Sequence, residues 1–443
     1  MTTDTSHSVV NAHYDTAIGI DVHLDLLVCA YQYCDREAKK IRTDFAEFHT
    51  AASDLKRFGR WCAERHPEII LMESTGVLWR SPYETLEKFG FTTDQLALVN
   101  ARDVKAVYGR KSDEQDAKRL AEIARVGNFK KSFVPPREFR DMRVISRNYR
   151  TSTNDYSRHK NRYQKDLNST GCRASTVFSN VNGMAAQNIL RAYILDGADL
   201  ETVIKNNCRR LKATPEEIYD ALRVEFSPAM LMMLRDDLVH LTWLEDRQER
   251  LLDMLRTIQG PYEEFIRRLC TIPGINEITA RLLFAELTDN LEAFSSSEHL
   301  ASWLGVCPGN NESAGKKHAC GTPKGNKYAR QVLIEAANGI SLMKSGALHD
   351  RFEAYRIRRG RKRAIVAIAH LLVRIIYALY KNECDYCETP DQALRDVCLR
   401  RISTAARLAK RHNVRVDVER NEMVDLETGE IRPIPNGVFV NAG

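Results

Sequence analysis

The sequence lacks any apolar run long enough to cross a membrane, since no stretch approaches the roughly 18 apolar residues that a spanning helix needs. Its first residues, Met1-Thr2-Thr3-Asp4-Thr5-Ser6-His7, also lack the charged and then apolar pattern of a secretory signal. We therefore expect a cytoplasmic protein with no membrane partner.

The cysteines lack a regular framework. Eleven of them are scattered over 443 residues, a distribution typical of reduced thiols in a chain of this size. Only Cys384 and Cys387 have the spacing of a metal-binding or redox pair, and no second Cys or His pair stands nearby at a finger-like distance. The pattern therefore gives little support to a zinc site there.

The charge is modest in total but uneven along the chain. The net charge is +7, whereas the segment from Ala301 to Glu383 alone carries fifteen Lys or Arg against five Asp or Glu. A hydrophobic content of 43% is ordinary for a globular protein, and the length suffices for two or three domains. The local basic excess indicates a polyanionic partner.

Residues 14–130 alternate strand-like and helix-like segments, which is typical of an α/β domain. The strand-like runs are Ala17 to Asp21, Leu26 to Tyr31, Ile69 to Met72 and Gln95 to Val99. The helix-like segments are Ala51 to Arg65, Tyr83 to Phe89 and Asp113 to Arg125. Pro135-Pro136 interrupts this pattern.

Residues 131–260 are almost entirely helix-compatible, with a further helical insert near 168–230 in which we find no chemistry. A three-four alternation of leucines predicts either a coiled-coil arm that pairs protomers or a helix packed on its own domain. These leucines are Leu231, Leu234, Leu238, Leu241, Leu252 and Leu255.

We expect a mainly α domain at 261–385, and then a basic helix, Ala393 to Arg411, and a tail in 386–443. The tail is either a hairpin or disordered. Within the third domain, Ile272-Pro273-Gly274-Ile275-Asn276 resembles a helix-hairpin-helix turn, whose glycines let backbone amides approach a phosphate. The alternative is a helical hairpin that only supports the domain.

Four acidic residues are the candidate catalytic and metal-binding set: Asp21, Glu73, Asp113 and Asp116. The first two follow apolar runs that predict buried strands, and the last two are three apart on a predicted helix and share a face. If the fold brings them together, their repulsion requires a cation, and oxygen ligands select Mg²⁺ or Mn²⁺. The alternative is that they only end strands and solvate a helix.

Two basic segments are candidate nucleic-acid contacts. A polar loop and the helix that follows it contribute Lys316, Lys317, Lys324, Lys327 and Arg330, and a later run contributes Arg356, Arg358, Arg359, Arg361, Lys362 and Arg363. Such cations neutralise backbone phosphates without reading base sequence. A solvated surface is the alternative for the later run.

The acidic motifs resemble the DEDD pattern of the insertion sequence 110 family of bacterial transposases. They are Gly19-Ile20-Asp21, Glu73-Ser74-Thr75-Gly76 and Lys111-Ser112-Asp113-Glu114-Gln115-Asp116-Ala117. A second block resembles that family in Gly305-Val306-Cys307-Pro308, Asn311-Glu312-Ser313-Ala314-Gly315 and Lys324-Gly325-Asn326-Lys327. The blocks stand in the expected order and cover most of residues 14–383.

The resemblance implies an RNase H-like (RuvC-like) catalytic domain, a helical coiled-coil middle and a mainly α transposase domain. It implies transposition of the protein's own element by cutting and rejoining DNA through a covalent phosphoserine, with Ser313 as the nucleophile and Mg²⁺ at the four carboxylates. It further implies donor and target double-stranded DNA, a structured noncoding guide RNA, and a homo-oligomer, a dimer or a tetramer, that acts at the bacterial nucleoid.

Two competing functions stay open. One is a metal-dependent nuclease or Holliday-junction resolvase, in which water attacks the phosphate and the product is not joined. The other is a nucleic-acid-binding scaffold whose acidic cluster is only structural. Covalent trapping of DNA on the protein separates the three, because only the recombinase leaves DNA attached and only the scaffold leaves it uncut.

Overall fold

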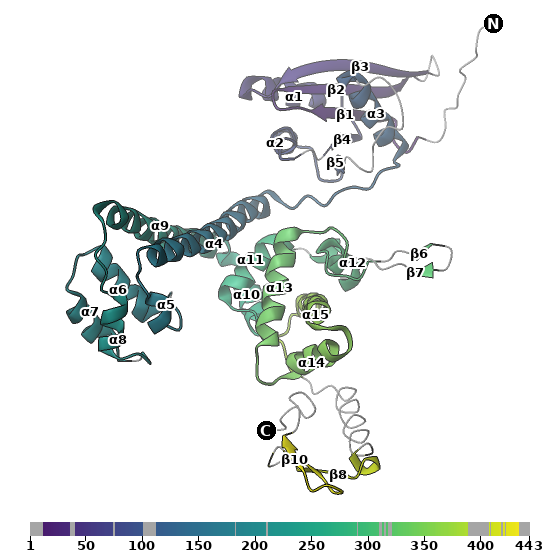
Figure 1. The fold of residues 1–443 in the computed structure, drawn as a ribbon. Helices are drawn as coiled ribbons and strands as arrows, with labels where there is room; N and C mark the ends of the chain where they lie inside the picture. Colours follow the sequence, from purple (N-terminus) through teal and green to yellow (C-terminus); the bar gives the residue numbers. More distant parts are fainter. Residues whose placement is uncertain are drawn as a thin grey trace. The chain divides into compact units, whose positions relative to one another are not determined.

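The chain folds as two compact units, Met1–Pro135 and Pro136–Gly443, which join in sequence at the proline pair. Figure 1 follows the elements of each unit in chain order. The computed structural model describes residues 12–35, 40–73, 76–100, 112–181, 183–209, 211–289, 291–309, 312–313, 316–317, 321–388, 407, 409–417, 420 and 422–433.

The first unit is built on a mixed five-stranded sheet. Its strands are β1 (Thr16–Val22), β2 (Leu26–Asp35), β3 (Lys40–His49), β4 (Ile69–Glu73) and β5 (Leu96–Val99), in the order β3-β2-β1-β4-β5. The first three strands form an antiparallel meander, whereas β4 and β5 run parallel to β1. The predicted α/β character of this region is confirmed.

Helices cover both faces of this sheet. On one face, α1 (Ala52–Glu64) and α2 (Arg80–Lys88) bury Phe58 and Tyr83 against Ile18 and Ile70. On the other face lies α3 (Asp113–Val126), whose alanines pack on β1 and β2. The alternation of side chains along each strand therefore sorts every strand residue to one of two cores.

Strand β3 was not predicted from the sequence. This strand lies at the edge of the sheet, and seven of its ten residues are exposed, with Ile41 and Phe45 among them. An exposed edge strand buries little apolar surface, so it lacks the apolar run by which β1 and β4 were predicted. The prediction for α2 also began three residues late, at Tyr83.

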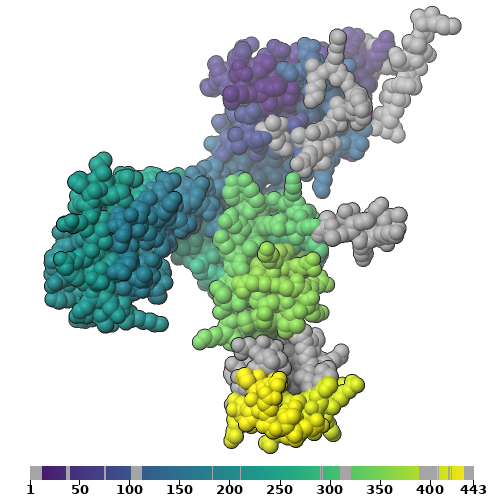
Figure 2. Space-filling view, in the orientation of Figure 1, coloured from purple at the N-terminus to yellow at the C-terminus, as the bar shows by residue number. Residues whose placement is uncertain are grey.

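The second unit begins with two long helices that lie side by side. They are α4 (Arg137–Ser169) and α9 (Pro228–Ile258), and between them in sequence α5 (Ala174–Val177), α6 (Met184–Ile194), α7 (Leu200–Asn207) and α8 (Pro215–Leu222) form a small helical lobe. Figure 2 shows this lobe as the teal mass around one end of the pair. Leu234, Leu238 and Leu241 of α9 are buried within the same chain, which agrees with the helix packed on its own domain.

A second group of helices follows. Its members are η1 (Gly260–Tyr262), α10 (Glu263–Cys270), α11 (Glu277–Leu287), η2 (Leu291–Ala293), α12 (Ser297–Trp303), α13 (Lys327–Ser341), α14 (Ala347–Arg359) and α15 (Arg361–Asn382). Among the described residues, α15 is the one helix whose length and composition would allow it to cross a membrane. Its residues Ile368, Leu372 and Ile376 are buried, and the helix contacts α10, α12, α13 and α14, as a core helix does.

Three short hairpin strands end the described chain. They are β8 (Val414–Asp417), β9 (Glu422–Asp425) and β10 (Ile431–Pro433), paired as an antiparallel meander. Of the two interpretations of the tail, the hairpin is the one that agrees with these residues. Most of the predicted basic helix, Ala393 to Arg411, lies outside the described residues.

Candidate functional site

The register of the sheet brings the carboxyl ends of β1 and β4 together. These strands are parallel neighbours, with Ile20 beside Met72. Asp21 and Glu73 are the next residues along the two strands. Because Ile20 and Met72 face the core beneath α1 and α2, the alternation turns both carboxylates to the opposite face, which α3 covers.

Helix α3 lies unusually close to β1 because residue 19 is glycine. A Cβ placed on Gly19 would lie 2.2 Å from the carbonyl oxygen of Ala117 and 2.2 Å from the amide nitrogen of Ala121. No larger residue leaves room for the helix backbone at this height. The contact fixes the height of the helix above the strand, and the first turn of this helix carries Asp113 and Asp116.

Local signals explain where α3 begins and ends. The Ser112 side chain accepts a hydrogen bond from the amide of Gln115 at 3.3 Å, and Gly127 ends the helix with a φ of 74°. Asp113 and Asp116 lie at the positive end of the helix dipole, which favours carboxylates. The helix therefore begins at the predicted residue and presents two acids beside the sheet.

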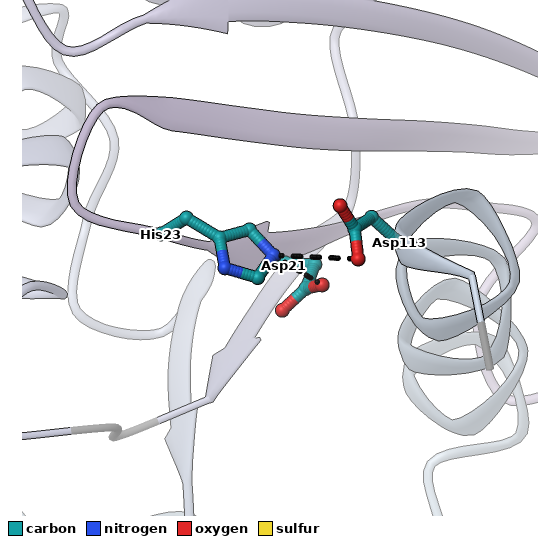
Figure 3. A group of neighbouring side chains, drawn as sticks. All are labelled: Asp21, His23 and Asp113. Carbon is teal, nitrogen blue, oxygen red and sulfur yellow. Dashed lines mark hydrogen bonds and ion pairs between the residues drawn. The ribbon is translucent and has the colours of Figure 1, made fainter.

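Asp21, His23 and Asp113 converge at this edge of the sheet, as Figure 3 shows. The Nε2 atom of His23 lies 3.1 Å from Oδ2 of Asp21 and 3.6 Å from Oδ1 of Asp113. His23 was not among the residues predicted from the sequence. The signal that could have found it is the period of two along β1, because residues 21 and 23 share a face of the strand.

Electrostatics link Asp116 to the same site. Burial raises the pKa of Asp21, the hydrogen-bonded His23 lowers it, and the negative charges of Asp116 and Asp113 raise it. Glu73 stands at the end of the adjacent strand and is partly buried. The structure thus brings Asp21 and Asp113 together, with Asp116 close enough to influence Asp21 and Glu73 one strand away.

The donor atoms fit a hard divalent cation. One donor atom each from Asp21, His23 and Asp113 lies within 4.8 Å of the other two, and this is the one such group among the described residues. Carboxylate oxygens suit Mg²⁺ and Mn²⁺, whereas an imidazole nitrogen favours a softer ion than Mg²⁺. Burial and the nearby negative charges of Asp116 and Asp113 raise the pKa of Asp21, so a bound cation would favour its charged form.

Ser313 lies in a small hairpin of the second unit. Its backbone forms β6 (Glu312–Ser313), which pairs antiparallel with β7 (Lys316–Lys317), and Ser313 is opposite Lys316. Only the backbone of these four residues is described. The neighbouring predicted loop residues Asn310, Asn311, Ala314, Gly315 and His318 lie outside the described residues.

The remaining predicted cations lie on or beside helices of the second unit. Lys324 is exposed just before α13, and Lys327 and Arg330 belong to the first turn of that helix. The later run continues across Gly360, whose φ of 78° separates α14 from α15, and residues 356–363 are all exposed. Arg356 pairs with Glu353 at 2.6 Å, so it is not fully available to a phosphate.

The turn that resembles a helix-hairpin-helix is occupied by the protein itself. A Cβ on Gly274 would lie 2.8 Å from the carbonyl oxygen of Ala336 in α13, and the Asn276 side chain accepts a hydrogen bond from the amide of Thr279 as the N-cap of α11. The close approach that glycine permits here is therefore made to another helix. This agrees with a hairpin that supports the domain.

Two family models match the chain. A model described as "Transposase" matches residues 18–171, which contain the four acidic residues. A model described as "Transposase IS116/IS110/IS902 family" matches residues 266–353, which contain Ser313 and its hairpin.

Curated relatives point to the same family. The chain is 28% identical over 182 residues to "Transposase for insertion sequence element IS1111A" of Coxiella burnetii, covering 36% of this chain and 49% of that protein. It is 29% identical over 175 residues to "Transposase for insertion sequence element IS1328" of Yersinia enterocolitica, covering 39% and 50%. The chain thus spans about half the length of the curated relatives it matches.

The family models and the relatives agree with one another and with the order of the motifs. The two models together cover more than half of the 443 residues. This chain belongs to the IS110 family of transposases.

Proposed function

We propose that the protein is a DNA transposase that cuts and rejoins DNA through a covalent phosphoserine intermediate. The observation that supports this most directly is the convergence of Asp21, His23 and Asp113 at a sheet edge, in a chain of a transposase family. Acidic side chains gathered around a cation are the recurring solution for attack on a phosphodiester.

We assign the first unit to the RNase H-like (RuvC-like) class, with the catalytic domain at 14–130. The support is its topology: an antiparallel three-stranded meander, two further parallel strands, and an acidic helix across the sheet. We propose three further regions: the helical region 131–260, the mainly α transposase domain 261–385, and the basic helix and tail 386–443.

In this mechanism the four carboxylates of Asp21, Glu73, Asp113 and Asp116 would hold a divalent cation, with Mg²⁺ favoured over Mn²⁺. When bound, Mg²⁺ would neutralise charge that develops on the scissile phosphate. Ser313 Oγ attacks phosphorus, so that an Oγ–P bond forms while the bond from phosphorus to the leaving sugar oxygen breaks. The hydroxyl proton passes to a base or to solvent.

The basic residues would hold the nucleic acid. Exposed guanidinium and ammonium groups around Gly360 and at the start of α13 can neutralise several phosphates. These contacts position nucleic acid without selecting a sequence. Selection of donor and target duplexes would then fall to a guide RNA of the same element by base pairing.

We further propose that the protein acts in the cytoplasm at the nucleoid, as a homo-oligomer in which Ser313 of one protomer can complete the acidic site of another. The support for this assembly is the family to which the chain belongs.

Covalent trapping tests the proposal. Purified protein is incubated with Mg²⁺, RNA transcribed from the element and a labelled duplex that carries the junction between the element and its flank, and is then run on a denaturing gel. We expect a labelled protein band with the wild type and none with Ser313→Ala, which removes the attacking oxygen. Ser295→Ala is the matched control, because Ser295 precedes α12 and lies outside the serine hairpin.

The acidic residues are tested in the same assay. Alanine at Asp21, Glu73, Asp113 or Asp116 should abolish strand cleavage without unfolding the protein, whereas Glu114→Ala on the same helical turn should cut normally. If Glu114→Ala were inactive while Asp116→Ala cut normally, the assigned set would be wrong.

The other functions give different products. Clean cuts without any adduct in the wild type would support a nuclease or resolvase that activates water. Bound but uncut DNA in the presence of Mg²⁺ would support a scaffold.

A further inference from the structure

A buried carboxylate of the second unit contacts Asn326, which follows the loop that carries Ser313. Glu286, near the end of α11, is fully buried among apolar neighbours that include Phe284 and Leu287. A buried charge is destabilising unless it is paired and hydrogen-bonded. The partners of Glu286 therefore indicate what this charge does.

Two arginines of α4 hold Glu286 from one side. Arg147 donates two hydrogen bonds to it, from Nε to Oε1 at 2.8 Å and from a terminal nitrogen to Oε2 at 3.0 Å. Arg143 donates to the Glu286 backbone carbonyl at 2.6 Å, and its Nε lies 3.4 Å from Oε2. The two arginines are four residues apart and so share one face of α4.

The third partner comes from the stem of the serine hairpin, that is, from residues 303–305 and 325–328 at the two ends of the loop that carries Ser313. Asn326 donates from Nδ2 to Oε2 of Glu286 at 2.7 Å. Its Oδ1 accepts from the amides of Tyr328 and Ala329, so the same side chain caps α13. Asn326 thus ties the start of α13 to α4 through one buried carboxylate.

The two sides of the stem also touch directly. The backbone amide of Asn326 donates to the carbonyl oxygen of Trp303 at 3.0 Å. A Cβ on Gly325 would lie 2.3 Å from the amide nitrogen of Gly305, and one on Gly305 would lie 2.8 Å from the amide nitrogen of Gly325. Two glycines facing each other let the chain close the loop that contains Ser313 at a fixed pair of positions.

Cationic and aromatic groups extend the same network. The Arg143 guanidinium lies 5.6 Å from the centre of the Trp303 ring, and that of Arg147 lies 4.4 Å from the ring of Tyr328. Each arginine therefore touches a residue on one side of the stem as well as Glu286.

We propose that Glu286 is a positioning residue for the serine hairpin. Together with Asn326 and the two α4 arginines, it fixes the two ends of the loop that carries Ser313, at Trp303 to Gly305 and at Gly325 to Asn326. This inference rests on the proposed nucleophilic role of Ser313. An immobile stem matters because a displacement of about 1 Å of a reacting group lowers the rate by about 100-fold.

The test compares Glu286→Gln with Glu245→Gln in the full chain. Glu245 of α9 is the control, since it also joins two helices, accepting hydrogen bonds from Tyr156 of α4 and Arg191 of α6, but among the described residues it has no contact with Asn326 or Trp303. We expect Glu286→Gln to form the protein–DNA adduct about 100-fold more slowly, with unchanged affinity for the same labelled duplex. The control should form the adduct at the wild-type rate.

Hydrogen exchange measured by mass spectrometry provides a readout that does not depend on catalysis. In Glu286→Gln, the amides of the peptide that contains Asn326 should lose protection, while peptides from α15 should not. If the wild type forms no adduct, the serine mechanism fails, and this exchange result alone decides whether Glu286 fixes the stem. Wild-type protection at Asn326, or adduct formation at the wild-type rate in Glu286→Gln, overturns the inference.

A second pair of variants covers the case in which Glu286→Gln does not fold. Asn326→Ser keeps an oxygen that can cap α13 but loses the amide that donates to Glu286, whereas Asn326→Ala loses both. We expect both to slow adduct formation by about 100-fold, with a lower melting temperature only for the alanine variant. If the loss of adduct followed the loss of stability instead, Asn326 would have only a structural role and the inference would fail.

Discussion

Replacing Gly19 by alanine should move α3 away from the sheet and so disrupt the candidate metal site. The added Cβ would meet two backbone atoms of α3 at 2.2 Å, whereas ordinary contacts begin at 3.4 Å. Backbone atoms cannot turn aside as a side chain can, so the helix has to shift by about 1.2 Å. Asp113 and Asp116 would move with it.

The magnitude follows from this overlap. Overpacking costs roughly 1–3 kcal/mol, and we expect about 3 kcal/mol because both obstructing atoms belong to the backbone. For a unit of this size that corresponds to a melting temperature lower by on the order of 10 °C. The displacement exceeds the roughly 0.5 Å within which a constellation of ligands stays productive, so cation affinity should fall as well.

Circular dichroism and calorimetric titration with Mn²⁺ measure the two effects on the full chain. Gly260→Ala is the matched control, because a Cβ there meets nothing within 4 Å. It should change stability by less than about 1 kcal/mol and leave Mn²⁺ binding unchanged. Wild-type melting together with wild-type Mn²⁺ affinity in Gly19→Ala would refute the idea that this glycine sets the height of α3.

Three further results are expected. Neutralising four exposed cations should weaken binding to all DNA sequences alike and lower the salt slope of binding by about one unit per lost phosphate contact, measured by fluorescence anisotropy at several salt concentrations; an unchanged slope would assign the run to a solvated surface. These four are Arg358, Arg359, Arg361 and Lys362. Hydrogen bonds from Arg256 and Arg281 lower the pKa of Glu277 to about 2 from 4.5, so its contribution to stability is complete above pH 4.5 and is lost as the pH falls towards 2. Glu277→Gln should therefore flatten the melting temperature as a function of pH in that range, and an unaltered profile would contradict it. Gly274→Ala should lower the melting temperature, because its Cβ would meet the carbonyl of Ala336 at 2.8 Å; a stable variant with weakened DNA binding would instead favour a phosphate-binding turn.

The elements around the acidic site could be predicted because their signals are local. β1 and β4 are apolar runs buried on both faces, and α3 has both a serine N-cap and a glycine stop. β3 has neither an apolar run nor a buried face, so its pairing with β2 is visible only in the fold. Periodicity finds what is buried, and an edge strand is mostly exposed.

The site was predicted less completely than the strands. Asp21 and Asp113 could be selected as carboxylates next to a strand and a helix. His23 follows Asp21 by two residues, in a segment with several polar residues among which nothing distinguishes it. Glu286 gave no signal, since one acid flanked by apolar residues forms no motif. Its arginine partners are 139 and 143 positions away in the chain.

The leucines of α9 illustrate a different limit. Their spacing correctly indicates a helix with one buried stripe, but periodicity does not identify what covers the stripe. The covering helix is α4 of the same chain, which is separated from α9 in sequence by the helices of the lobe, α5–α8. A second copy of the chain would have produced the same spacing.

The paired helices also have a mechanical consequence. With 33 residues, α4 is about 50 Å long, and a tilt of only about 5° at its Arg137 end carries its far end through about 4 Å. Arg143 and Arg147 form hydrogen bonds with Glu286 of α11 near the Arg137 end, whereas the lobe of α5–α8 packs around the other end. Any rotation of α4 at α11 would therefore displace the lobe by a larger distance than it displaces Arg143.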